Sequence, residues 1–209
     1  MMYLLLAVLS YLFGAVPFGF LVARARGVDI RSVGSGNIGA TNVFRTVGKG
    51  WGILTLLLDA LKGYIPAALF PAFLSRATGC EAGNAAPVVF ACLAVAGHNW
   101  PVYLRFKGGK GIATTAGALL GIAPAALGVG VCVWVAAFVL TRYVSVASIL
   151  AALAVPASAW CFYRSESLLI PIMLTVLGMA AVIRHHTNIK RLIDGTESKI
   201  TFGKKTKTG

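Results

Sequence analysis

The stretch IATTAGALLGIAPAALGVGVCVWVAAFVL, residues 112–140, decides the fold of this chain. A membrane-spanning helix needs about 20 mostly apolar residues, so these 29 uncharged residues are long for one helix and short for two. Gly121 and Pro124 lie near the middle, where a proline removes a backbone donor and interrupts a helix. Whether the stretch forms one helix or two sets the number of spans and the side on which the chain ends.

Similar apolar runs fill most of the remaining chain. They cover 2–23, 51–74, 86–104, 144–163 and 168–183. The chain is 58% hydrophobic and 12% charged, whereas soluble domains are about 45–50% apolar and about 25% charged, so a soluble globular protein is excluded. Arg24 and Arg26 follow the first run rather than precede it, which favours an uncleaved span over a signal peptide.

The basic residues decide between one helix and two in 112–140. The chain has 19 Lys and Arg against 6 Asp and Glu, and cytoplasmic loops of membrane proteins are enriched in Lys and Arg. One helix gives six spans, with nine basic residues on each side of the membrane. A break between Gly121 and Pro124 gives seven spans, with 16 basic residues on one side and only Arg76 and Arg164 on the other. The sequence therefore predicts an all-α bundle of seven transmembrane helices, N-terminus outside and C-terminus in the cytoplasm.

The predicted bundle is a single domain over residues 1–195. The two short helices in 112–140 must pack inside it, and small residues such as Gly117 and Gly130 allow their backbones to approach neighbours closely. Residues 196–209 contain four lysines and are expected to form a disordered basic cytoplasmic tail above anionic lipid. Because the basic residues lie between membrane spans, the positive charge is not interpreted as a nucleic-acid-binding surface.

The loop 24–50 reads RARGVDIRSVGSGNIGATNVFRTVGKG and is rich in glycine. Successive glycines let backbone N–H groups converge on an anion, hydroxyl and amide side chains add donors, and arginine adds a bidentate fork. The candidate binding residues are Ser35, Gly36, Asn37, Gly39, Thr41, Asn42 and Arg45. A flexible polar linker is the alternative interpretation, and no Walker A motif is present.

A second basic segment, HNWPVYLRFKGGKG, covers residues 98–111. Its candidate residues are Lys107, Gly108, Gly109 and Lys110. They precede a helix predicted to begin near Ile112, and the N-terminus of a helix favours anions. A basic turn that only follows the charge rule is the alternative.

Two shorter segments complete the predicted site. RYVS at 142–145 supplies Ser145, and RHHTNIKRLIDG at 184–195 puts His185 and Asn188 on one helical face. No carboxylate or cysteine supports metal binding by these side chains, so neither a metal nor a cofactor is expected.

These segments offer many anion donors and almost no acids. Asp59 in the second run is followed three residues later by Lys62, an ion pair that lowers the cost of both charges in lipid. The pattern indicates a site for two phosphates or similar anions at the cytoplasmic surface of an apolar bundle. An apolar groove beside such a site favours lipid chemistry.

Six motifs resemble those of the acyl-phosphate-dependent glycerol-3-phosphate acyltransferases of bacterial membranes. They are GSGNIGATN at 34–42, DALKG at 59–63, GHNWPV at 97–102, FKGGKG at 106–111, RYVS at 142–145 and RHHTNI at 184–189. The resemblance implies seven helices in the bacterial inner membrane and an active site on the cytoplasmic face. It also implies transfer of a fatty acyl group from acyl phosphate to the 1-hydroxyl of glycerol 3-phosphate, giving lysophosphatidate and inorganic phosphate.

The resemblance also implies roles for the candidate residues. The glycine loop and Arg45 would hold phosphate groups, Lys110 would neutralise phosphate charge beside Ser145, and His185 and Asn188 would orient glycerol 3-phosphate. Because acyl phosphate is an activated mixed anhydride, positioning and oxyanion stabilisation supply the catalysis. A phosphate oxygen of the substrate is the hypothesised base, with His185 as the alternative.

Two other function classes fit the sequence less well. A transporter for a phosphorylated solute would commonly show repeat symmetry, and no internal repeat is visible in this sequence. A CDP-alcohol phosphotransferase needs a cluster of aspartates for a divalent metal, and no two acids of this chain suit that role.

Overall fold

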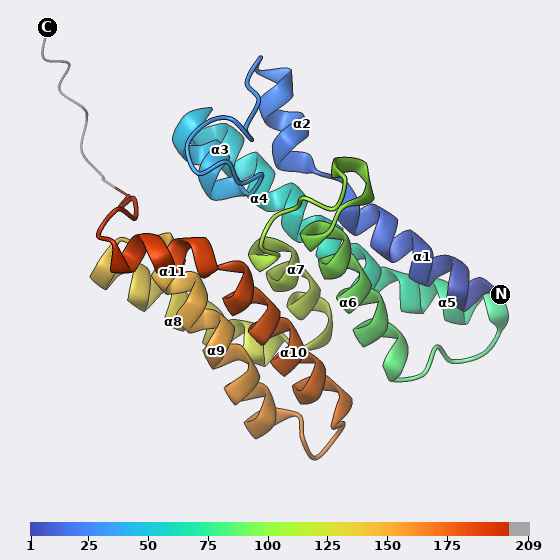
Figure 1. Ribbon diagram of the computed structural model, residues 1–209. Helices are drawn as coiled ribbons and strands as arrows, with labels where there is room; N and C mark the ends of the chain where they lie inside the picture. The colour runs from blue at the N-terminus through green and yellow to red at the C-terminus, as the bar shows by residue number, and fades with distance from the viewer. Residues whose placement is uncertain (201–209) are drawn as a thin grey trace, which may run out of the picture.

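The computed structural model describes residues 1–200, which form helices and loops without a strand among them. The helices are α1 (Met2–Ala15), α2 (Phe18–Ala25), α3 (Ala40–Thr46), α4 (Lys49–Tyr64), α5 (Phe70–Thr78), α6 (Ala85–Asn99), α7 (Ile112–Ile122), α8 (Pro124–Thr141), α9 (Val144–Phe162), α10 (Leu169–Arg184) and α11 (His186–Ile193). A π-helical turn joins α4 to α5, and a short 3-10 turn follows α6. Figure 1 shows their arrangement.

The structure breaks the stretch 112–140 where the sequence predicts. α7 ends at Ile122, α8 begins at Pro124, and Ala123 between them is not helical. Pro124 occupies the first position of α8, where its missing N–H would have no helical partner in any case. α7 has 11 residues. At 1.5 Å per residue such a helix is about 17 Å long, too short for about 30 Å of hydrocarbon.

Several helical segments are long and apolar enough to cross a membrane. Within residues 1–200 these are Met2–Ala25, Lys49–Thr78, Ala85–Leu104, Pro124–Thr141 and Val144–Phe162. α10 and α11, which are bent by 49° relative to each other, make a sixth if they are taken together. α7 is a further apolar helix of shorter length. The chain is therefore a multi-pass membrane protein.

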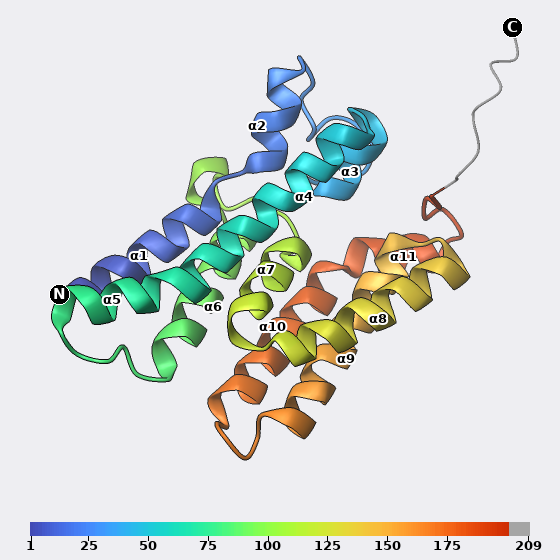
Figure 2. The same ribbon diagram turned by 180° about the vertical axis from the view of Figure 1, so that it is seen from behind.

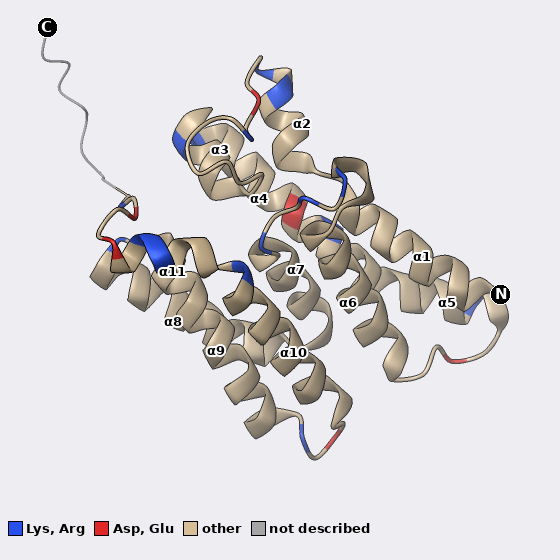
Figure 3. Cartoon of the chain, viewed as in Figure 1, with Lys and Arg blue, Asp and Glu red and all other residues tan. Residues whose placement is uncertain are grey.

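α7 lies between two groups of helices (Figures 1 and 2). In the first group α1 packs against α6, and α4 packs against α7 itself. In the second group α9 packs against both α8 and α10. The loops around 26–39 and 100–111 gather with α2, α3 and α11 at one end, which we call the polar end. Figure 3 shows most of the lysines and arginines there. The polar segments that the sequence singled out thus lie together in space.

Two glycines allow α7 to pack closely against α4. A Cβ atom on Gly117 would lie 1.8 Å from the carbonyl oxygen of Ala60, and one on Gly63 would lie 2.0 Å from that of Thr114. Small residues at such a contact let the helix backbones approach each other within a membrane. A helix too short to span the bilayer is thereby held inside the bundle.

Replacing Gly117 by valine is expected to destabilise the bundle by about 1–3 kcal/mol, because the added side chain overpacks the contact between α4 and α7. The measurement is the thermal unfolding midpoint in detergent. Gly128→Val in α8 is the matched control, because a Cβ atom there meets no atom within 4 Å. Equal midpoints for the two variants would contradict a tight contact at Gly117.

The predicted ion pair of Asp59 and Lys62 is present and buried. Lys62 Nζ lies 2.8 Å from Asp59 Oδ1, and the two residues are 1% and 2% exposed. Lys62 Nζ also donates a hydrogen bond of 2.7 Å to the carbonyl oxygen of Val16, where α1 ends before α2 begins. His98 Nδ1 lies 3.7 Å from the same Asp59 oxygen. The pair therefore ties α4 to the break between α1 and α2.

Candidate active site

A cavity of about 410 Å³ begins among the polar segments and continues between apolar helices. Its polar wall includes Ser35, Asn37, Thr41, Arg45, Lys110, Ser145, His185 and Asn188. Its apolar wall includes Leu119, Leu127, Val131, Trp134, Val155 and Leu177, from α7, α8, α9 and α10. One continuous cavity therefore joins polar donors to an apolar compartment.

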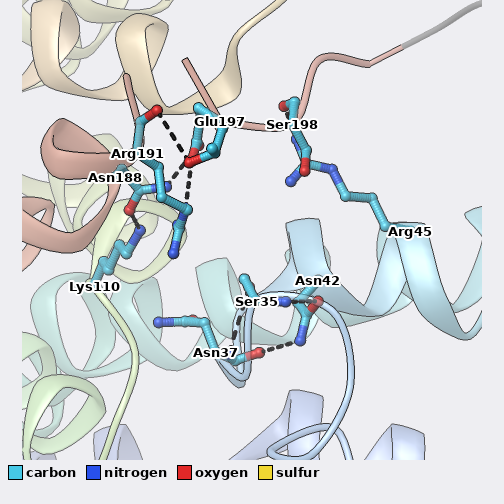
Figure 4. Close-up of polar contacts among 10 residues, drawn as sticks. Ser35, Asn37, Asn42, Arg45, Lys110, Asn188, Arg191, Glu197 and Ser198 are labelled. Carbon is cyan, nitrogen blue, oxygen red and sulfur yellow. Dashed lines mark hydrogen bonds and ion pairs between the residues drawn. The ribbon is translucent and has the colours of Figure 1, made fainter. Parts of the chain in front are cut away.

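Asn42 organises the glycine loop. Its Oδ1 accepts a hydrogen bond from the Ser35 backbone N–H, and its Nδ2 donates to the Asn37 carbonyl oxygen (Figure 4). Its Nδ2 also donates to the carbonyl oxygens of Ile30 and Val33. Asn42 is 3% exposed, and the described loop occupies both ends of its amide. Its role in the structure is therefore to shape the loop that presents the neighbouring donors.

Position 34 of this loop requires glycine. Gly34 has a φ of 59°, and a Cβ atom there would lie 2.3 Å from Asn42 Oδ1. Asn37 Oδ1 accepts the Gly39 N–H at 2.8 Å, so the turn that leads into α3 is also held by a side chain. Ser35, Asn37, Gly39 and Thr41 consequently line one side of the cavity.

Arg184 holds the second basic segment in place. Its Nε donates to the Gly109 carbonyl oxygen at 3.0 Å, and its Nη2 donates to those of Gly108 and Gly109 at 3.0 and 2.7 Å. A Cβ atom on Gly109 would lie 2.0 Å from His98 Nε2, so a side chain at that position would force the buried His98 ring to move. α7 begins at Ile112, as predicted.

Four of the candidate residues do not line the cavity, namely Gly36, Lys107, Gly108 and Gly109. Lys107 is exposed, whereas Gly108 and Gly109 form the backbone that Arg184 binds. Gly108 and Gly109 thus help to position the next residue, Lys110, which lines the cavity.

Lys110 and Asn188 meet across the cavity. Lys110 Nζ donates a short hydrogen bond to Asn188 Oδ1 (Figure 4). Burial, followed by the nearby positive charge of Arg191, lowers the pKa of Lys110 from 10.5 to about 8. An ammonium has three N–H donors, so two remain for a ligand beyond the bond to Asn188.

His185 and Asn188 both line the cavity, as their spacing on one helical face predicts. His185 sits at the bend between α10 and α11 and is 3% exposed. Its Nδ1 lies 2.7 Å from the Ala181 carbonyl oxygen, which can only accept a hydrogen bond. Nδ1 therefore carries the hydrogen, and in the neutral ring Nε2 is left as an acceptor.

Two residues of the site were not anticipated, Glu197 and Arg191. Glu197 Oε1 accepts a hydrogen bond of 2.7 Å from Asn188 Nδ2, and Glu197 Oε2 accepts one of 2.7 Å from Arg191 Nε (Figure 4). Arg45 Nη2 donates to the Ser198 carbonyl oxygen at 2.8 Å. The expectation of a disordered tail from residue 196 is corrected for 196–200, which pack on the site, while 201–209 lie outside the described residues.

The grouping of metal-ligating side chains in the described residues also bears on the chemistry of the site. Residues 1–200 contain no group of three or more His, Cys, Asp or Glu side chains placed to hold an ion. Apart from acids such as Glu197, the polar wall of the cavity is rich in cations, amides and hydroxyls, which are ligands for anions.

Comparison with known proteins gives consistent matches. A family model described as glycerol-3-phosphate acyltransferase matches residues 4–195. The glycerol-3-phosphate acyltransferase of Desulforudis audaxviator is 46% identical over 198 residues, 94% of each chain. Glycerol-3-phosphate acyltransferase 1 of Rhizobium johnstonii is 41% identical over 195 residues, 93% of this chain and 89% of that protein.

Two solved structures resemble the fold. Both are PlsY (YgiH), an integral membrane glycerol 3-phosphate acyltransferase. Its glycerol 3-phosphate form has a TM-score of 0.85 at 37% identity, and its lysophosphatidic acid form a TM-score of 0.82 at 36% identity. Each comparison covers 96% of both chains.

Proposed function

The chain belongs to the glycerol-3-phosphate acyltransferase family, and from that premise we propose that it transfers a fatty acyl group from an acyl phosphate to the 1-hydroxyl of glycerol 3-phosphate. The products are lysophosphatidate and inorganic phosphate. The reaction is an acylation of phospholipid biosynthesis.

The observation that carries this proposal is the two-part cavity. An acyl phosphate has an anionic head and a long apolar chain, and glycerol 3-phosphate brings a second anion. Arg45 and Lys110 provide cationic donors in the polar part, and side chains such as Leu127 and Trp134 provide walls for the chain. Cations and oriented amides beside an apolar compartment suit both substrates at once.

The chemistry follows from positioning. The 1-hydroxyl oxygen attacks the acyl carbonyl carbon, an ester C–O bond forms, and the bond between that carbon and the phosphate oxygen breaks. Holding two anions side by side and stabilising the oxyanion supply the rate enhancement, because phosphate is already a good leaving group. The hydroxyl proton has two acceptors at this site, a phosphate oxygen of the substrate and His185 Nε2.

We also propose a topology of seven membrane segments in the bacterial inner membrane, with the N-terminus outside and the active site at the cytoplasmic face. The break after Ile122 supports it, because it adds α7 to the longer segments. The gathering of lysines and arginines at the polar end supports the orientation (Figure 3).

The donor is tested with purified protein in detergent, given palmitoyl phosphate and glycerol 3-phosphate without added metal. Release of inorganic phosphate with formation of lysophosphatidate in equal amounts is the expected result. Acylation from a thioester donor alone would overturn the assignment of acyl phosphate.

A further inference from the structure

A carboxylate lies within a site built for anions. Glu197 lines the cavity and is 8% exposed. Burying a carboxylate is costly unless it is paired and hydrogen-bonded. Both oxygens of Glu197 are bonded, one to the Asn188 amide and one to the Arg191 guanidinium. In the proposed reaction this buried carboxylate has no assigned role.

The bonds around Asn188 fix the direction of its amide. An ammonium can only donate hydrogen bonds and an ionised carboxylate can only accept them. The amide oxygen must therefore face Lys110 and the amide nitrogen must face Glu197, which is the arrangement in Figure 4. Without the Glu197 carboxylate, no acceptor in this set of bonds would hold the Asn188 amide nitrogen. The Asn188 amide could then rotate and turn its nitrogen toward Lys110.

The segment that carries Glu197 is anchored at several points. The backbone N–H groups of Thr196 and Glu197 donate to the Arg191 carbonyl oxygen at 2.8 and 3.0 Å. Further along, the Ser198 carbonyl oxygen accepts from Arg45, and the Ile200 N–H donates to the Arg142 carbonyl oxygen at 3.0 Å. Residues 196–200 therefore connect α11 with α3 and with the turn before α9.

We propose that Glu197 is a positioning residue for acyl transfer, acting through the hydrogen-bonded series Glu197–Asn188–Lys110. The inference rests on the proposed function, because it assigns Glu197 to the reaction of that site. By accepting from Asn188, Glu197 keeps the amide oxygen on Lys110, and the ammonium is thereby aimed at the phosphate. Arg191 fixes the other oxygen of Glu197 and so holds the carboxylate in place.

A different role, a carboxylate that competes with the substrate phosphate, fits the contacts less well. A competing anion would bind the cations that the substrate needs. Among the described residues, Glu197 forms its ion pair with Arg191 and none with Lys110. Lys110 contacts the series only through Asn188 and keeps donors for a ligand.

The pKa of Lys110 provides a second way to test the role of Glu197. The charged and titratable groups that act on Lys110 or respond to it are Arg191, Glu197, Arg184, Arg45 and His185. Glu197 is the negative member of this set and favours the ammonium form of Lys110, against burial and the arginines. Burial alone would raise the pKa of Glu197, but hydrogen bonds from Arg191 and Asn188 hold it below the usual value. The carboxylate is therefore ionised wherever Lys110 titrates.

The test compares Glu197→Gln with Asp194→Asn in the full-length protein in detergent. Each variant removes one carboxylate from the chain that follows α11, but Asp194 is exposed and Glu197 is buried. We expect kcat/KM for glycerol 3-phosphate at pH 7 to fall by about 10- to 100-fold in E197Q, as for loss of a hydrogen bond to a charged group. D194N should keep the wild-type value.

The pH profile separates positioning from a structural role. In the wild-type protein, kcat/KM should decline as the pH rises through the pKa of Lys110, about 8. In E197Q the decline should begin at lower pH, because the ammonium has lost a favourable charge. In E197D, which keeps the charge on a shorter side chain, the decline should stay near the wild-type pH. Binding of inorganic phosphate, measured by calorimetry over the same pH range, should follow the same order.

Any one of three results would overturn the proposal. Wild-type kcat/KM and an unchanged profile in E197Q would show that the series does not act on the reaction. A lower KM with higher activity in E197Q would identify Glu197 as a competing anion. Equal losses in D194N would indicate a general effect of charge. If the wild-type protein fails with acyl phosphate, the proposed function fails, and phosphate binding by the same variants still decides the role of Glu197.

Discussion

Replacement of Lys110 by alanine is expected to lower kcat/KM at pH 7 by about 100- to 1000-fold, the range found when a preorganised electrostatic donor is removed. Lys110 lines the cavity, is bonded to Asn188, and keeps two N–H donors for the substrate. In a site partly closed to water its charge acts more strongly than it would at the surface. The measurement is phosphate release from palmitoyl phosphate in the presence of glycerol 3-phosphate.

Arg164→Ala is the control, because Arg164 lies in the exposed loop between α9 and α10, at the opposite end of the bundle from the glycine loop. R164A should retain wild-type activity. Lysine is charged below its pKa and neutral above it, so the decline of wild-type activity through pH of about 8 should be missing in K110A. Equal losses in K110A and R164A, or a retained decline in K110A, would contradict the assignment.

Replacement of Lys62 by methionine is expected to destabilise the protein by about 3–5 kcal/mol, the cost of leaving a buried charge without its partner. Asp59 lies inside the bundle, 2.8 Å from Lys62 Nζ. The substitution also leaves the Val16 carbonyl oxygen without the Lys62 hydrogen bond at the break between α1 and α2. The thermal unfolding midpoint in detergent measures the loss.

The double variant Asp59→Asn with Lys62→Met should recover much of this loss, because no unpaired carboxylate remains. Lys49→Met, at the exposed start of α4, should leave the midpoint near that of the wild-type protein. A double variant no more stable than K62M would show that the penalty does not come from the unpaired carboxylate of Asp59.

The sequence predicts the broken helix at 112–140 but not the other local irregularities. Pro17 in the first run carries the same signal as Pro124, and the structure breaks there between α1 and α2. The count of basic residues on each side of the membrane distinguishes one helix from two only at 112–140. It therefore does not predict that the first apolar run, 2–23, is divided. The sequence also predicts a loop where α3 forms, because seven residues are too few for a clear helical pattern.

The candidate site was largely predictable because its residues lie in short polar motifs between apolar runs. Glu197 was not, since its role depends on where the chain turns after α11. Gly195 has a φ of 68°, and the turn it permits brings Glu197 back to Arg191. A glycine just after the last residue of a helix commonly ends that helix. Gly195 therefore predicts the end of α11, and Glu197, two residues later, could have been placed beside that end.

The contact between α4 and α7 also bears on where Lys110 lies along the bundle. Gly63 and Gly117 bring these helices into close contact, and Lys110 lies two residues before the start of α7. A slip of α7 by one residue would move its N-terminus by about 1.5 Å along the helix axis and rotate it by about 100°. The position of the Lys110 ammonium along the bundle therefore depends on a distant contact made by two residues without side chains.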